Sequence, residues 1–92
     1  MPELASIQVT ADELARRLQQ VHNGDSLDMV AQHLGGAPYQ DEEHAGGRRL
    51  WWRFFLVDRP ESMGRYEIYR GDFEHDCLTF GAIVPQGATA QE

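Results

Sequence analysis

The stretch Arg49-Leu50-Trp51-Trp52-Arg53-Phe54-Phe55-Leu56-Val57 decides the fold of this chain. Aromatic and β-branched residues favour strands, so this run predicts a β-strand over residues 49–57. Successive side chains of a strand point to opposite sides of the sheet. One side therefore carries Leu50, Trp52, Phe54 and Leu56, and the other carries Trp51, Phe55 and Val57 beside Arg53. Both sides of the predicted strand are apolar.

Two amphipathic helices are predicted before this strand. Thr10-Ala11-Asp12-Glu13 has the form of a capping box, in which the Thr10 hydroxyl accepts from the Glu13 amide and the Glu13 carboxylate returns to the cap. An apolar stripe of Leu14, Leu18 and Val21 continues from it as a helix. Ser26 begins a second, shorter helix that stops at Gly35-Gly36-Ala37-Pro38. The short connection between them predicts a helical hairpin.

The C-terminal half predicts two more strands, over 65–70 and 77–84, and a mobile loop from Tyr39 to Arg48. Short connections between consecutive strands imply antiparallel pairing. The predicted fold class is therefore α+β, a two-helix hairpin on a three-stranded antiparallel meander in the order α-α-β-β-β. One domain spans residues 1–85, and residues 86–92 form a flexible tail. The helices cover one face of the sheet, and the other is either covered by loops or left open.

Composition bounds the function classes. The 92 residues are 41% hydrophobic, which is enough for one thin core, and 8 basic against 15 acidic residues give a net charge of −7. That sign disfavours nucleic acid and anionic membranes as partners. The single cysteine, Cys77, excludes an internal disulfide, and no export signal or membrane span is visible. We expect a cytoplasmic protein, or a periplasmic one if an export signal was removed.

No catalytic or metal-binding constellation is recognisable. The four histidines are scattered, and the only local group of ligand types is His75-Asp76-Cys77 with Asp72 and Glu74. Acidic residues and a histidine in a turn are ordinary turn chemistry, and a single cysteine commonly fills space in a core. We expect no enzyme activity, no cofactor and no metal, with a small Cys77–His75 enzyme as the least favoured alternative.

One family resemblance emerges from the helical region. Gly24-Asp25-Ser26, Val30, Leu34-Gly35 and Pro38 resemble the signature of SmpA/OmlA-type and β-lactamase-inhibitor-like domains, with one extra residue before the proline. The resemblance covers roughly residues 14–84. It implies a two-helix, three-strand layer fold that binds another protein through its exposed sheet face or loops. Roles in such families include envelope-complex assembly and inhibition of an enzyme.

The aromatic strand supplies the main functional hypothesis, because Trp, Tyr and Arg are enriched at binding hot spots. We predict a non-catalytic protein-binding domain of inhibitor, immunity or assembly type. Its site combines a sheet face with an acidic loop that would meet a basic target, and the candidate residues are Trp51, Arg53, Phe55, Arg65 and Tyr69 with Asp41, Glu42 and Glu43. Two alternatives stay open: that both tryptophans are only core residues, and that the chain is a homo-oligomeric structural domain without another partner.

Overall fold

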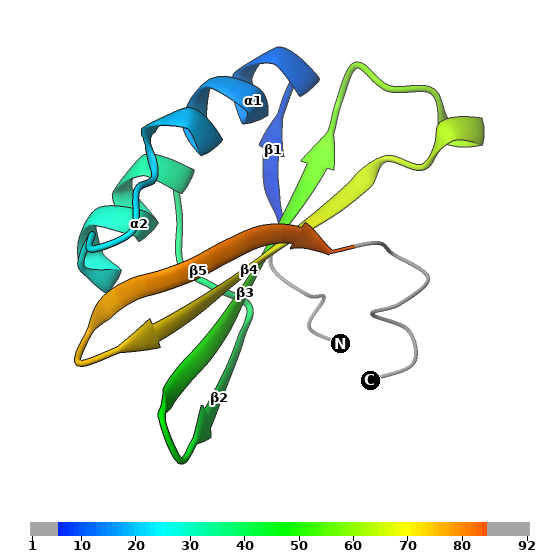
Figure 1. Cartoon of the computed structure of the whole chain (residues 1–92). Coiled ribbons are helices and arrows are strands. Elements are labelled where there is room, and N and C mark those ends of the chain that lie inside the picture. The colour runs from blue at the N-terminus through cyan, green and yellow to red at the C-terminus, as the bar shows by residue number, and fades with distance from the viewer. Residues whose placement is uncertain (1–5, 85–92) are drawn as a thin grey trace.

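The computed structural model describes residues 6–84 as two helices packed on one face of a twisted sheet (Figure 1). The predicted flexible tail lies outside the described residues. The elements, in chain order, are β1 (Ile7–Val9), α1 (Ala11–Gln20), α2 (Leu27–Leu34), β2 (Gln40–His44), β3 (Gly47–Leu56), the short 3-10 helix η1 (Glu61–Met63), β4 (Tyr66–Glu74) and β5 (Cys77–Val84).

The sheet has five strands and is mixed, so the prediction of a three-stranded antiparallel meander is wrong in strand number and in direction. The α+β class, the two helices and the antiparallel β3–β4–β5 pairing are confirmed, and the strand order is β1-β3-β4-β5. Strand β3 has ten residues, and its outer edge has room for two partners. β2 pairs antiparallel with Gly47–Trp51, and β1 pairs parallel with Phe54–Leu56.

The segment predicted as a mobile loop, Tyr39 to Arg48, instead contains strand β2 and its turn into β3. All five residues of β2 are polar and exposed, which is why their pattern does not indicate a strand. The strand forms because the long β3 offers an unpaired edge. At its far end a Cβ on Gly47 would overlap the carbonyl oxygen of Phe73, so only glycine fits there.

The helix caps follow the sequence, with one difference. Thr10 Oγ1 accepts from the Glu13 amide at 3.1 Å, and Ser26 Oγ accepts from the Met29 amide at 3.2 Å. The Glu13 carboxylate does not return to the cap as predicted. It accepts hydrogen bonds from Arg16 and Arg17, which lie one turn further along α1. Two guanidinium groups are stronger partners for a carboxylate than one backbone amide.

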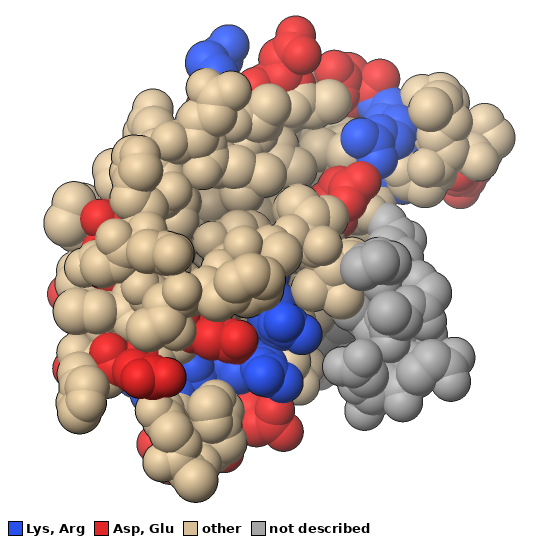
Figure 2. All heavy atoms as spheres, viewed as in Figure 1, with Lys and Arg blue, Asp and Glu red and all other residues tan. Residues whose placement is uncertain are grey.

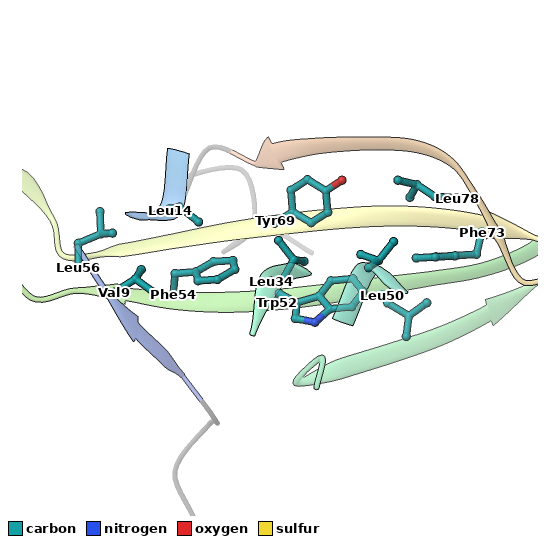
Figure 3. Close-up of a cluster of buried hydrophobic side chains, with 11 residues drawn as sticks. Val9, Leu14, Leu34, Leu50, Trp52, Phe54, Leu56, Tyr69, Phe73 and Leu78 are labelled. Carbon is teal, nitrogen blue, oxygen red and sulfur yellow. The ribbon is translucent and has the colours of Figure 1, made fainter. Parts of the chain in front are cut away.

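The core lies between the helices and the sheet face that carries Trp52 (Figure 3). Trp52 and Phe54 are completely buried, as predicted for that side of β3, and the Trp52 ring contacts the rings of Tyr69 and Phe73. The indole Nε1 of Trp52 donates to the carbonyl oxygen of Gly36 at 2.9 Å. This bond joins the sheet to the turn that ends α2.

The same turn is held from the helix side. Gly35 takes the left-handed conformation, with φ of 95°, and forms the C-cap of α2. Arg17 of α1 donates from Nη1 to the carbonyl oxygen of Leu34 at 2.9 Å. The left-handed angle requires glycine at position 35, and a Cβ there would also push the Arg17 guanidinium away from the Leu34 carbonyl.

Candidate protein-binding face of the sheet

The sheet has a second face, turned away from both helices, which we call the helix-free face. Strand register places alternate residues of three strands on it, since directly paired residues share a face. They are Arg49, Trp51, Arg53 and Phe55 of β3, Tyr66, Ile68, Arg70 and Asp72 of β4, and Phe80, Ala82 and Val84 of β5. Of the predicted face residues, Trp51, Arg53 and Phe55 lie here.

Four side chains on and beside this face form a continuous row, which we call the Arg–aromatic cluster: Arg53, Tyr66, Phe55 and Arg65. The Arg53 guanidinium carbon lies 4.1 Å from the Tyr66 ring centroid. The Tyr66 and Phe55 rings meet edge to face at 5.2 Å, and the Arg65 guanidinium carbon lies 5.8 Å from the Phe55 centroid. All four residues are partly exposed. A cation–π contact at a half-exposed site contributes about 0.5–1 kcal/mol, so each contact favours this arrangement modestly.

Arg65 owes its position to a backbone contact. Its Nε donates to the carbonyl oxygen of Arg59 at 2.8 Å, which fixes the side chain against the loop between β3 and β4. Arg59 in turn forms an ion pair with Glu67 at 2.7 Å. The cluster is therefore built on two paired strands and braced by their connecting loop. Tyr66 was the member that the sequence analysis left out of the site, although its alternation with Glu67 placed it on one face of a half-buried strand.

Trp51 lies on the helix-free face but is only 7% exposed, and it is not part of the core cluster around Trp52. Its cross-strand partners are Gln40 of β2 and Arg70 of β4. A ring so well covered supports the face from within and offers little surface to a partner. Trp51 was predicted to be one of the contact residues, and its 7% exposure leaves little of its ring for a partner to contact.

The prediction that Tyr69 shares this face is wrong. Tyr69 pairs with Trp52, lies in the core between sheet and helices, and is 6% exposed. Burial raises the pKa of its phenol, and the nearby Asp25 carboxylate adds to that rise. Tyr69 is a structural residue here.

Charge is distributed unevenly over the molecule. On β3, β4 and β5 the helix-free face has three arginines, Arg49, Arg53 and Arg70, and one acid, Asp72, although the whole chain has a net charge of −7. Asp72 forms an ion pair with Arg49 at 2.9 Å and lies 3.9 Å from Arg70. Figure 2 shows arginine atoms beside acidic ones just below β5, on the side away from the helices.

Two of these arginines have unused hydrogen-bonding capacity. Within residues 6–84, no carboxylate forms an ion pair with Arg53, and the buried Nε of Arg70 has no hydrogen-bond acceptor. The Arg70 Nε is too well covered to meet a partner, whereas Arg53 is partly exposed. The helix-free face is thus locally positive, and Arg53 is the guanidinium on it that is accessible and without an ion pair in the described residues.

The acidic residues do not form the single patch that was predicted. Asp41, Glu42 and Glu43 are consecutive residues of strand β2, so they alternate between the two sides of the sheet. Glu42 pairs with Arg49 and shares the helix-free face, whereas Asp41 and Glu43 point to the opposite side. Asp41 already forms an ion pair with Arg48.

The residues considered for chemistry do not converge. Cys77 is exposed at the start of β5, and His75 lies in the adjacent two-residue turn with a positive φ of 54°. No group of three His, Cys, Asp or Glu side chains in the described chain, 6–84, is arranged to hold a metal ion. An open depression of about 290 Å³ beside the start of α2 is lined by Ser26, Leu27, Asp28 and Asp76. It brings together two carboxylates and the Ser26 hydroxyl, which is engaged as the N-cap of α2.

The fold and its site define a small α+β domain with a cationic, aromatic sheet face. No known protein family, no curated protein and no solved structure matches this chain. The resemblance to SmpA/OmlA-type and β-lactamase-inhibitor-like domains therefore stays a prediction. Neither helix in the described residues is long and apolar enough to cross a membrane.

Proposed function

We propose that this chain is a non-catalytic protein-binding domain that uses the Arg–aromatic cluster on its helix-free face to hold an acidic segment of another protein. The observation that supports this most directly is the row Arg53–Tyr66–Phe55–Arg65, because its members are partly exposed and already ordered by contacts with one another. Ordered side chains lose less rotamer freedom when they bind, so more of the contact energy appears as affinity.

The chemistry of the partner follows from the charge of the face. Guanidinium groups bind carboxylates with paired hydrogen bonds, and aromatic rings supply apolar area between them. Arg53 and Arg65 lie at the two ends of the row with Tyr66 and Phe55 between them. A complementary segment therefore presents two carboxylates flanking an apolar side chain. A basic partner was expected for the acidic loop, but a basic partner on this face would be repelled by its three arginines.

A photoreactive phenylalanine analogue in place of Phe55 tests the proposal in the native host. We expect a discrete crosslinked protein, identified by mass spectrometry, whose contact peptide is rich in Asp and Glu. The matched control carries the same analogue in place of Met29, an exposed residue of α2 on the other side of the molecule. We expect no crosslink from that position.

Two changes at Arg53 then test the role of charge. Arg53→Glu should reduce crosslinking from position 55 by roughly tenfold or more, because it places like charges in contact. Arg53→Lys keeps the charge and should retain most of it. Equal crosslinking by both variants, or no crosslinked protein from position 55, would refute the proposal, provided that circular dichroism shows both variants folded.

A further inference from the structure

The outer edge of strand β5 is the least protected part of the sheet. Within residues 6–84 this edge is hydrogen-bonded only at its beginning. There the Gly24 amide donates to the backbone carbonyl of Leu78 at 2.7 Å, and the Leu78 amide donates to the backbone carbonyl of Asp25 at 2.8 Å. A bridge between Ser26 and Cys77 closes the same end. From Thr79 to Val84 the strand has β4 on one side and no described strand on the other. Alternate backbone groups of an edge strand point away from its single neighbour and stay available for pairing.

The side chains of this edge make pairing favourable. β5 has the sequence CLTFGAIV, without a charged residue or a proline. Phe80 is 52% exposed and Ile83 38% exposed, and their cross-strand partners place them on opposite faces of the sheet. Natural edge strands are kept from associating by charged side chains, by prolines or by being short. Beyond Leu78, β5 has no charge and no proline. Its register against β4 shifts at Thr79, so the regular part of the edge is Phe80–Val84.

The other edge of the same sheet is protected in two ways. Its β2 half carries Asp41, Glu42 and Glu43, and its β1 half is only three residues long. Two such edges brought together would place carboxylates opposite carboxylates, which is destabilising. The molecule thus has one edge that repels a second copy and one edge that accepts it.

From this asymmetry we infer that β5 pairs with β5 of a second copy of this chain, antiparallel about a two-fold axis, to join two sheets edge to edge. Two-fold pairing places the same uncharged stretch on both sides of the contact, so it needs no complementary charge from elsewhere. If the axis lies near Ala82, each Asp76 is six residues away from it along the strand. The two acidic turns are then about 40 Å apart at roughly 3.4 Å per residue, several times the Debye length of about 8 Å. The net charge of −7 does not oppose this arrangement strongly.

The size of the contact sets the expected affinity. Pairing over six residues buries the exposed parts of Phe80 and Ile83 from each copy and lies at the low end of specific interfaces, below about 1,200 Å². We expect a dissociation constant on the order of 10–100 μM. The dimer forms reversibly over the concentrations used for sedimentation and nuclear magnetic resonance.

Sedimentation equilibrium of the full 92-residue chain, at concentrations from about 5 μM to 1 mM, measures this self-association. Ile83→Lys introduces a charge on the pairing edge and should weaken the dimer at least tenfold. Met63→Lys adds the same charge at a 69% exposed residue of η1, in the loop between β3 and β4, and should not weaken association. It controls for the reduction in net charge, which by itself favours association.

Hydrogen exchange locates the contact. At high concentration the alternate amides of residues 79–84 that point away from β4 should become protected, while the amides of β2 stay unchanged. A strict monomer at 1 mM, a dimer that Ile83→Lys does not weaken, or protection confined to the helix-free face around Phe55 would each overturn the inference. Arg53→Glu should dimerise normally, so failure of the protein-binding proposal and failure of this one give different results.

Discussion

Gly81 in β5 should be intolerant of alanine because of a single neighbour. A Cβ at this position would overlap the hydroxyl oxygen of Tyr69 and lie 2.6 Å from its Cζ. Tyr69 is 6% exposed and its ring packs against Trp52, so it has little freedom to move aside. Two effects of Gly81→Ala then compete. Alanine restricts the unfolded chain and stabilises by about 0.4–1 kcal/mol, whereas overpacking a core costs about 1–3 kcal/mol.

We expect the overlap to win, with a net loss of about 1–2 kcal/mol in the free energy of unfolding. For a domain of this size that corresponds to a fall in Tm of roughly 5–15 °C. Urea titration followed by circular dichroism measures the loss. Gly46→Ala is the control, because nothing lies within 4 Å of a Cβ there, and its Tm should stay equal or rise slightly.

The double variant identifies the cause. Tyr69→Phe removes the hydroxyl but leaves the ring carbon at 2.6 Å, so it should relieve part of the strain. The cost of Gly81→Ala should be smaller by at least about 0.5 kcal/mol in the Tyr69→Phe background than in the original chain. Strictly additive losses, or a Gly81→Ala protein as stable as the original, would refute the reasoning.

Two further predictions concern the turn between β4 and β5 and the start of α1. His75 and Asp76 both have positive φ, 54° and 64°, which suits Asn-Gly in a two-residue hairpin turn. His75→Asn with Asp76→Gly should therefore raise the free energy of unfolding by about 1 kcal/mol in urea titration, and an unchanged midpoint would contradict this. Hydrogen bonds from Arg16 and Arg17 hold the pKa of Glu13 below its ordinary value of 4.5. A carboxyl group whose pKa is lower in the folded state stabilises the folded protein at pH values above its unfolded-state pKa. This stabilisation is lost as the pH falls through the folded-state pKa. Glu13→Gln should accordingly flatten the loss of stability below about pH 4.5 in acid titrations, and an unchanged acid titration would contradict this.

The aromatic strand allowed most of the core to be predicted. Alternation along β3 assigned Leu50, Trp52, Phe54 and Leu56 to one side, and all four are buried there. The third predicted strand coincides with β5 at 77–84. These assignments succeeded because each depends on a local pattern of large apolar side chains, which only a strand of that register can bury.

The two extra strands and the true shape of the site depend on distant contacts. β1 pairs Ile7 with Phe54 across nearly fifty positions of sequence, and β2 has no apolar residue to indicate that it is a strand. Tyr69 was misplaced because a tyrosine suits either side of a strand, and its register against Trp52 decides the matter. Nor does alternation show that Trp51 is only 7% exposed, since burial on a face without helices depends on cross-strand neighbours, which for Trp51 are Gln40 and Arg70.

The turn that ends α2 is bound from two directions, by Arg17 at the Leu34 carbonyl and by Trp52 at the Gly36 carbonyl. Trp52 follows Trp51 directly along β3, and the two rings lie on opposite faces of the same strand. The strand that carries the helix-free face on one side thus holds the end of α2 on its other side, through one indole hydrogen bond.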